Sequence, residues 1–250
     1  MTEQEYKIIV FGGNSDIARS YLEAILAQSP SRKFKFILIG RDAVQLSIRK
    51  GHFEVLGANV DIICSDLSEI ETVTHSLSYI SEFDEAFICF SELTNQKQSE
   101  TDSDYLISQV NLNFSFNACW INFCIEKFIK QNFGKLIVLG SVAGDLGRKK
   151  NYTYGAAKAG LEVFCKGVQH RIAHHQSIQL HLIKPGIIAT KMTEGVQSSG
   201  VLVTKVESVG RSILKRVSRA KRVSYVPGYW RFIMLIVKNI PWKIFKRLDF

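Results

Sequence analysis

The stretch SVAGDLGRKKNYTYGAAK, residues 141–158, contains three side chains around which the rest of the chain can be interpreted. Tyr154 and Lys158 are four residues apart, and Ser141 lies thirteen residues before the tyrosine. If the second half of the stretch is helical, Tyr154 and Lys158 share a face, close enough for the ammonium to favour an ionised phenol. Such a phenol with a hydroxyl beside it suits proton transfer to a carbonyl oxygen. The stretch therefore predicts a proton-transfer cluster.

Apolar runs and helical patterns alternate on both sides of this stretch. The runs that predict strands are 7–11, 34–39, 59–66, 85–90, 134–141 and 177–186. Helical patterns lie near 17–28, 103–130 and 152–174, a short helix is expected after the second strand, and Ser68 is a candidate cap for a helix after the third. Strands separated by helices indicate repeated βαβ units. We therefore expect an α/β fold with a doubly wound parallel sheet and helices on both faces.

Length and charge divide the chain into two parts. The 250 residues, 46% hydrophobic and 22% charged, suit one soluble domain with a full core. Residues 205–250 hold twelve Lys and Arg against two acidic residues, a net charge of +10, so residues 1–204 carry −1 of the total of +9. We expect a dinucleotide-binding and catalytic domain over 1–204, with a substrate loop near 189–204. A basic, aromatic extension over 205–250 either completes that domain or lies in a membrane interface.

The cysteines and the N-terminus predict a reducing compartment. The five cysteines are scattered, mostly within apolar runs, and contain no CxxC pair, which favours buried free thiols over disulfides. The acidic N-terminus leads directly into a strand, so no signal peptide is expected. These features predict a cytoplasmic protein.

The turn GGNSDIA, residues 12–18, is a candidate phosphate-binding site. It follows the first predicted strand and precedes a helix, where backbone N–H groups bind pyrophosphate in doubly wound folds. Gly12 allows a tight turn, and Asn14 and Ser15 offer polar groups, with Asp16 and Ile17 beside them. The usual three-glycine pattern is incomplete, because Asp16 and Ala18 stand where glycines are common, so an ordinary strand–helix turn is the alternative.

With Ser141, Tyr154-x-x-x-Lys158 and Pro185-Gly186 in this order, residues 7 to about 195 resemble the short-chain dehydrogenase/reductase family. The resemblance implies a Rossmann fold in which Tyr154 is the general acid and Ser141 binds the substrate carbonyl. Lys158 would lower the pKa of Tyr154 and bind the nicotinamide ribose. The family's asparagine, which connects the lysine to solvent through water, best matches Asn111, with Asn113 as the competitor.

The same resemblance implies where a nicotinamide cofactor binds. Gly40 and Arg41 stand where an acidic residue would favour NAD, and an arginine suits a 2′-phosphate, so NADP(H) is favoured and NAD(H) is the alternative. Asp66 and Leu67 match the adenine contact of the family. The residues that match the segment beside the nicotinamide are Pro185, Gly186, Ile188 and Thr190.

Two places depart from the expected patterns. The turn that usually reads Asn-Ala-Gly after the fourth strand is replaced here by residues 89–92, CFSE, so the resemblance does not predict the backbone path beside the cofactor. His170, His174 and His175 invite a metal-site interpretation, but no HExxH motif or nearby carboxylate accompanies them, and a polar helix face is favoured. We therefore predict no metal site.

The segment 229–250 mixes aromatic and basic side chains. Its longest uncharged apolar run, residues 232–237, is far shorter than the ~20 residues that span a bilayer. The mixture, interrupted by Pro241, is typical of a segment lying in a membrane interface. A subunit interface is the alternative, and nucleic-acid binding is a third, without any recognised motif. This tail, the first turn and SVAG…YGxxKAGL resemble reductases of lipid-linked keto-sugars, such as decaprenylphosphoryl 2-keto-pentose reductases.

Together the patterns predict an NAD(P)(H)-dependent reduction of a carbonyl to an alcohol. The substrate would be a small or lipid-linked carbonyl compound at the inner membrane surface, and family habit implies a homo-oligomer. A non-catalytic, membrane-associated dinucleotide-binding scaffold is the alternative from another class, suggested by the missing glycines. The intact Ser–Tyr–Lys set argues against it.

Overall fold

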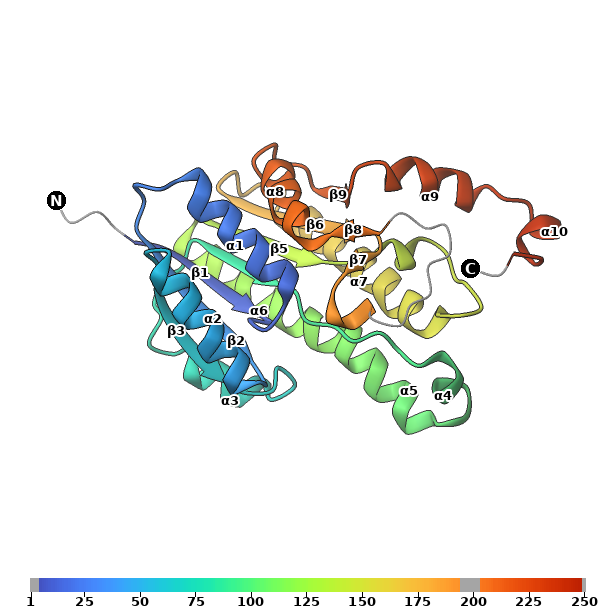
Figure 1. The fold of residues 1–250 in the computed structure, drawn as a ribbon, viewed down its shortest axis with the longest axis horizontal. Helices are drawn as coiled ribbons and strands as arrows, with labels where there is room; N and C mark the ends of the chain where they lie inside the picture. The colour runs from blue at the N-terminus through green and yellow to red at the C-terminus, as the bar shows by residue number, and fades with distance from the viewer. Residues whose placement is uncertain (1–4, 194–202, 249–250) are drawn as a thin grey trace.

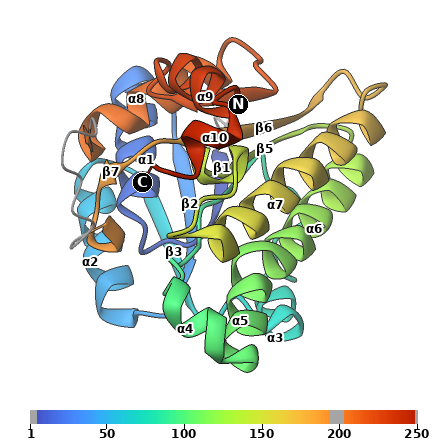
Figure 2. The ribbon, with the colours of Figure 1, turned by 90° about the vertical axis from the view of Figure 1, so that its right-hand side faces the viewer.

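The computed structural model describes residues 5–193 and 203–248, and a parallel β-sheet forms its centre (Figures 1 and 2). Seven strands pair in the order β3-β2-β1-β4-β5-β6-β9, all parallel. The strands of this sheet are β1 (Tyr6–Phe11), β2 (Phe34–Gly40), β3 (Asn59–Cys64), β4 (Glu85–Ile88), β5 (Gly134–Leu139), β6 (Ile178–Pro185) and β9 (Val223–Val226). After β3, at one edge, the chain crosses back to β4, which pairs with β1 on the side away from β2. The sheet is therefore doubly wound.

Helices cover both faces of the sheet, as the sequence predicts (Figure 2). One face packs against α1 (Asp16–Gln28), α2 (Ala43–Val55) and α8 (Val206–Val217). The other packs against α3 (Ile70–Ser76), α6 (Phe116–Gln131) and α7 (Tyr152–Arg171). Since strand side chains alternate between faces, Ile8 and Val10 enter the first core and Ile9 and Phe11 the second.

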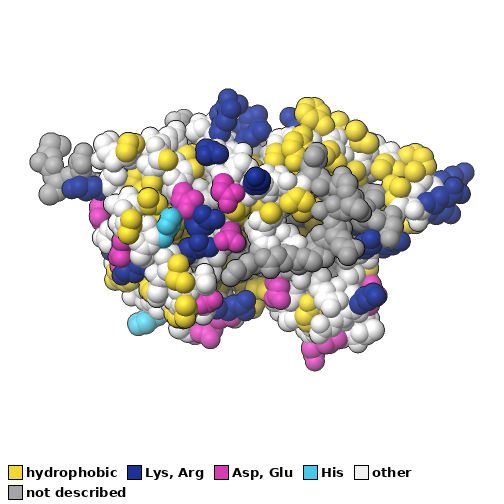
Figure 3. All heavy atoms as spheres, in the orientation of Figure 1, with side chains coloured by type: hydrophobic (Ala, Val, Ile, Leu, Met, Phe, Trp, Pro, Cys, Tyr) yellow, Lys and Arg dark blue, Asp and Glu magenta, His cyan; other side chains and the backbone are white. Residues whose placement is uncertain are grey.

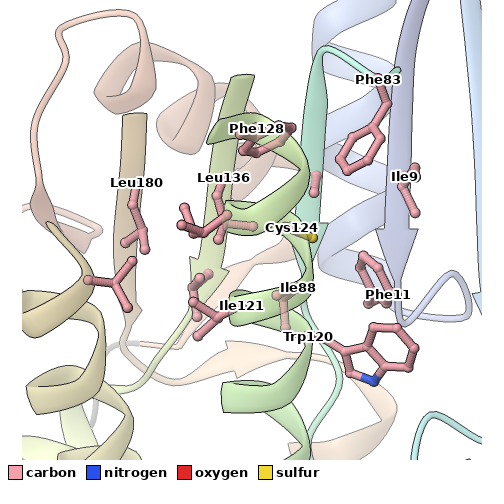
Figure 4. Packing of buried hydrophobic residues seen from close by; sticks show 14 of the residues in the cluster. Ile9, Phe11, Phe83, Ile88, Trp120, Ile121, Cys124, Phe128, Leu136 and Leu180 are labelled. Carbon is pink, nitrogen blue, oxygen red and sulfur yellow. The ribbon is translucent and has the colours of Figure 1, made fainter. Parts of the chain in front are cut away.

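The second core shows why these helices stay in place. Phe11 packs against Trp120 with ring centroids 4.7 Å apart, and both are fully buried (Figure 4). The Trp120 indole donates a hydrogen bond to the Leu67 carbonyl at 2.8 Å, which fixes the loop after β3. This loop carries two predicted cofactor residues, Asp66 and Leu67, so the core positions part of the candidate site.

The long helix predicted over 103–130 is interrupted. It consists of α5 (Ser103–Val110), a π-helical turn (Asn111–Ser115) and α6, and the short helix α4 (Gln96–Thr101) precedes it. A π-helical turn adds a residue to the helix and shifts which side chains share a face. The residues 111–115 therefore point in directions that a regular helix would not give them.

The first half of the basic extension belongs to the sheet and its helical layer. Helix α8 lies on α1, where Ser20 Oγ donates to the Val206 carbonyl at 2.8 Å, and β9 pairs with β6. A small ladder joins β7 (Ile188–Ala189) to β8 (Thr204–Lys205). Only α9 (Trp230–Lys238) and α10 (Trp242–Phe245) extend beyond the last strand. Sequence analysis did not find β9, a short run between basic residues.

Some local predictions are wrong. Ser68 does not cap a helix, because α3 begins at Ile70 after Glu69, and Ser68 instead donates its backbone N–H to the Asp66 carboxylate. The cysteines are free, but Cys64 and Cys119 are exposed rather than buried. Part of the predicted substrate loop, residues 194–202, lies outside the described residues. Of the helices within residues 5–193 and 203–248, none is long and apolar enough to cross a membrane.

Candidate active site

A cleft of about 940 Å³ lies at the carboxyl edge of the sheet. It includes the switch point between β1 and β4, where doubly wound folds bind ligands. Most of the residues predicted from sequence line this one cleft: Gly12, Asn14, Ser15, Asp16, Ile17, Arg41, Asp66, Leu67, Ser141, Tyr154, Pro185, Gly186, Ile188 and Thr190. The structure thus brings together residues that are up to 178 positions apart in the chain.

The first turn has the geometry that its glycine predicts. Gly12 has a φ of +105°, a conformation that L side chains rarely adopt, and a Cβ there would lie 2.9 Å from the Phe90 backbone nitrogen. Ser15 caps α1 by accepting from the Ala18 N–H at 3.3 Å. Asn14 donates to the Asp42 carbonyl at 3.1 Å and so ties the first turn to the turn after β2. The turn is well ordered by its own bonds, and the N-terminus of α1 faces the cleft.

Asp16 is held by a partner outside the turn. Its carboxylate pairs with Arg49 of α2 at 2.6 Å. This ion pair neutralises an acidic side chain that would otherwise repel a phosphate at the N-terminus of α1. The missing glycine is therefore compensated by charge pairing.

Arg41 and Asp66 form the far end of the cleft. They approach to 3.6 Å, and the Arg41 side chain is 67% exposed. Burial raises the pKa of the Asp66 carboxyl, but hydrogen bonds from Ser68 and the Arg41 charge outweigh it and leave that pKa below its usual value. Asp66 is therefore a carboxylate, and Arg41 keeps most of its guanidinium in solvent.

The Ser141, Tyr154 and Lys158 side chains meet at the other end of the cleft. Ser141 lies two residues after the end of β5, and its Oγ accepts from the Ala143 N–H at 3.0 Å. Tyr154 and Lys158 lie in the first two turns of α7. Ser141 also hydrogen-bonds the Tyr154 hydroxyl. Lys158 is 1% exposed, and its Nζ lies 5.7 Å from the Tyr154 ring centroid and 3.4 Å from the Leu139 carbonyl. Lys158 therefore lies beneath the cleft and Tyr154 at its wall.

The pKa values of this pair differ from the expectation that Lys158 lowers the pKa of Tyr154. Burial raises the pKa of the Tyr154 phenol above its ordinary value, and hydrogen bonds from Ser141 and Ser91 oppose the shift only in part. Burial lowers the pKa of Lys158 to about 8, and within the described part of the chain no carboxylate compensates its charge. In the unliganded protein Tyr154 is thus a protonated phenol, the form that a proton donor requires.

Ser91 was missed by sequence analysis. It lies in the turn that replaces the family's Asn-Ala-Gly sequence, lines the cleft and hydrogen-bonds Tyr154. Its signal in the sequence is its position after the fourth strand, where the resemblance does not predict the path of the backbone. The structure defines the backbone here: Cys89 continues the pairing of β4 with β1 by donating its N–H to the Phe11 carbonyl at 2.9 Å.

The structure separates the two candidate asparagines. Asn111 is half-buried, does not line the cleft, and accepts from Ser115 Oγ at 3.0 Å. Asn113 is fully buried and accepts from the Glu92 N–H at 3.0 Å, next to Ser91. The π-helical turn causes this difference, since it directs Asn113 toward the turn after β4. The sequence-based preference for Asn111 is not supported by this geometry.

Helix α9 supplies a wall of the cleft that sequence analysis did not predict. Its inward-facing side chains, Trp230, Ile233, Met234 and Val237, line the cleft. Trp230 is 7% exposed and lies directly over Gly186, where a Cβ would overlap the indole. Gly186 is therefore required for close approach of α9. No local pattern signals this contact, because the two residues are 44 positions apart.

The fold and the site together define the class of Rossmann-fold oxidoreductases: a doubly wound sheet with serine, tyrosine and lysine beside a cleft at its carboxyl edge. A family model described as short chain dehydrogenase matches residues 7–199. The chain belongs to this family.

Known proteins similar to this chain are oxidoreductases by name. An uncharacterized oxidoreductase of Mycobacterium tuberculosis is 25% identical over 247 residues, covering 96% of each chain. Carbonyl reductase family member 4 of Xenopus tropicalis is 30% identical over 209 residues, covering 81% of this chain and 83% of the relative.

Solved structures share the fold. A short-chain dehydrogenase from Sphingobium yanoikuyae in complex with NADPH superimposes with a TM-score of 0.79 at 16% identity, covering 98% of this chain and 96% of the other. A 3-oxoacyl-[acyl-carrier protein] reductase from Brucella melitensis in complex with NAD has a TM-score of 0.76 at 18% identity, covering 91% and 98%.

Proposed function

We propose that the protein is an NADP(H)-dependent carbonyl reductase that acts on an amphiphilic or lipid-linked keto-sugar at a membrane surface. The observation that carries the proposal is the cluster of Ser141, Tyr154 and Lys158 at one end of a cleft whose other end holds Arg41. Because the chain belongs to a family of oxidoreductases, this cluster supports the transfer of a hydride and a proton to a carbonyl group. The remaining features of the cleft support the cofactor and the substrate class.

The residues present fit a nicotinamide dinucleotide. The N-terminus of α1 faces the cleft without an unpaired acidic charge, because Asp16 pairs with Arg49. No carboxylate ends β2, where Gly40 stands, and Arg41 offers a guanidinium suited to a 2′-phosphate. These features support NADP(H). NAD(H) is the alternative, because Asp66 lies 3.6 Å from Arg41 and competes for its charge.

When bound, a nicotinamide cofactor supplies the hydride that becomes bonded to the carbonyl carbon. Tyr154 donates its phenolic proton to the carbonyl oxygen, so that the product is an alcohol. Ser141 donates a hydrogen bond to the same oxygen and polarises the carbonyl. The buried Lys158 ammonium stabilises the phenolate left on Tyr154. We assign the positioning role of the family asparagine to Asn113 rather than Asn111, because Asn113 supports the turn that holds Ser91.

The two faces of α9 support an amphiphilic substrate. Its inner face lines the cleft with apolar side chains, and its outer face exposes Phe232, Leu235 and Ile236 by 62–69%. Figure 3 shows hydrophobic side chains gathered over α9 and basic ones at the end of the molecule near α10. Exposed apolar side chains beside cations fit the surface of an anionic bilayer. The substrate would pass from the bilayer along α9 into the cleft.

Replacing Tyr154 tests the reaction. Tyr154→Phe should lower turnover of a ketone or keto-sugar panel by about 10³-fold, because general acid catalysis contributes on the order of 10²–10⁴-fold. NADPH affinity should be unchanged. Tyr152→Phe is the matched control, since its hydroxyl bonds Glu100 outside the cleft. Equal turnover in the Tyr154 variant, or no NADPH oxidation by the wild type with any panel member, would overturn the assignment and favour the scaffold.

Vesicle flotation tests the membrane site. We expect the wild type to float with anionic vesicles and less with neutral ones, and Phe232→Ser with Ile236→Ser to lose flotation. Val163→Ser is the control, because Val163 is 70% exposed on α7, away from α9. Flotation that is absent in the wild type, or equally lost in the control, would contradict a cytoplasmic enzyme bound to the inner membrane face.

A further inference from the structure

Buried polar atoms without partners gather in the cleft. Within the described residues, six buried side-chain N or O atoms have no hydrogen-bond partner, and three belong to residues that line the cleft: Arg148 Nε, Asn151 Oδ1 and Trp230 Nε1. Buried polar atoms are nearly always hydrogen-bonded in folded proteins, so each exception requires an explanation. Two donors and one acceptor around one cleft suggest that a ligand satisfies them.

Arg148 is the strongest of the three. Its side chain is half-buried, and burial lowers the pKa of its guanidinium, with no carboxylate of residues 5–193 or 203–248 to oppose the shift. The other half-buried arginine with an unpartnered Nε, Arg49, differs because it pairs with Asp16. An uncompensated buried cation costs stability. Such a cost is expected where a ligand anion provides the missing charge.

The position of Arg148 separates it from the cofactor end of the cleft. Arg148 follows β5, and Arg41 follows β2, with β1 and β4 between these strands. Three strand spacings of ~4.8 Å separate the two strands, about 14 Å in all. Arg148 also lies six residues before Tyr154 in the same loop-to-helix segment. Arg148 thus belongs to the segment that leads into the catalytic tyrosine, whereas Arg41 follows a strand in the other half of the sheet.

Asn151 and Trp230 add complementary groups. Asn151 occupies the N-cap position of α7, yet its side chain makes no capping bond, and its Oδ1 is free to accept from a hydroxyl. The indole of Trp230 contributes an N–H donor from α9. A substrate head group that bears an anion beside hydroxyl groups matches these donors and this acceptor.

We propose that Arg148 and Asn151 form a subsite for an anionic oxygen group, a phosphate ester or a carboxylate, carried by the substrate close to the carbonyl that is reduced. The inference rests on the proposed function and specifies its substrate class. The planar guanidinium of Arg148 binds the anion through paired hydrogen bonds, and Asn151 accepts from an adjacent hydroxyl. The apolar wall of α9 then contacts the remainder of the substrate.

A binding measurement tests the subsite without turnover. With the nucleotide site saturated by NADP, wild-type protein is titrated calorimetrically with inorganic phosphate, acetate and a ketose phosphate. We expect Arg148→Gln to weaken binding of the ketose phosphate at least tenfold, and Arg148→Lys to recover part of it. Tighter binding of phosphate than of acetate indicates that the substrate carries a phosphate ester, and tighter binding of acetate indicates a carboxylate. Arg219→Gln, an exposed arginine outside the cleft, is the control.

Two results would overturn the subsite. One is ketose-phosphate binding that Arg148→Gln leaves unchanged. The other is a tenfold loss of NADPH affinity in that variant, which would assign Arg148 to the cofactor. Unfolding temperature provides a fold check, because removing an uncompensated charge should leave it unchanged or higher. If no ketone is reduced but the binding difference persists, the proposed reaction fails and the subsite stands. If reduction occurs without any preference for anionic ketones, the subsite fails alone.

Discussion

Two buried lysines, one in α7 and one in the neighbouring strand β6, differ in their surroundings. Lys184 of β6 is 1% exposed and pairs with both Asp145 and Glu162. Lys158 is equally buried, yet the contacts of its Nζ with described residues are to the Leu139 carbonyl and the Tyr154 ring, and none is to a carboxylate. Glu162 lies one helical turn after Lys158, so the same helix supplies a carboxylate to one lysine and none to the other.

The presence or absence of carboxylate partners distinguishes cations that stabilise the fold from cations that we expect to contact a ligand. The ion network around Lys184 joins β6 and α7 to the last strand and to α9, because Asp145 also accepts from Tyr225 of β9 at 2.9 Å and lies 3.6 Å from Lys238 of α9. Lys158, like Arg148, faces the cleft region and has no carboxylate. Among the residues that the structure describes, Lys184 is thus held by two carboxylates, whereas Lys158 and Arg148, next to the catalytic tyrosine, are paired with none.

Breaking the paired network should produce the largest effect. Lys184→Met leaves Asp145 and Glu162 buried without their main cation, and removing one partner of a buried pair costs about 3–5 kcal/mol. We expect chemical denaturation to report a loss of this size at pH 7. Lys158→Met is the matched control, with no expected loss because no carboxylate is left unpaired. Equal destabilisation by the two variants would remove the distinction.

The pH dependence of stability should sharpen the same comparison. The pKa of Lys158 is lowered to about 8 in the folded protein, while the unfolded chain keeps the proton to its ordinary pKa near 10.5. Between pH 8 and 10 the unfolded state therefore binds more protons, and stability rises with pH. Each pH unit contributes at most about 1.4 kcal/mol, so the gain is on the order of 2 kcal/mol.

The measurement is the free energy of unfolding of wild type minus that of Lys158→Met, from pH 7 to 10. The difference should be flat below about pH 8 and should favour the wild type increasingly above it. The shifted pKa of Tyr154 is common to both proteins, so its contribution cancels in the difference. A difference that stays constant from pH 7 to 10 would show that Lys158 is not desolvated.

The sequence predicts those parts of the site whose signals are local. Apolar runs identify six of the seven strands in the sheet, and the spacing of Ser141, Tyr154 and Lys158 identifies the cluster. The choice between Asn111 and Asn113 was beyond pattern analysis, because a π-helical turn changes the helical period at those positions.

Long-range packing accounts for what remained hidden. Trp230 reaches Gly186 only because β9 extends the sheet beside β6, and β9 is four residues long within a basic segment. Arg148 stands in the run RKK and has the sequence pattern of a solvated loop. Its burial, like the burial that raises the pKa of Tyr154, results from packing of residues distant in sequence around the cleft.

Arg41 provides the smallest and most specific test of the comparison, since it is an exposed cation only loosely paired with Asp66. Exposed ion pairs contribute about 0.2–1 kcal/mol, so stability should not change in Arg41→Ala. A charge-assisted contact with a 2′-phosphate contributes about 1.5 kcal/mol, which corresponds to roughly tenfold in affinity. We expect NADPH binding to weaken by that factor and NADH binding to stay the same.

The reverse substitution completes this test. Arg41→Asp places an acid after β2 that accepts from a ribose 2′-OH and repels a 2′-phosphate, so the ratio of NADH to NADPH affinity should rise beyond that of Arg41→Ala. Fluorescence titration of both nucleotides against the three proteins gives this ratio. If both nucleotides weaken equally in Arg41→Ala, Arg41 contacts a group common to the two. Arg41 would then not distinguish the two nucleotides, and the preference for NADP(H) would lose its physical basis.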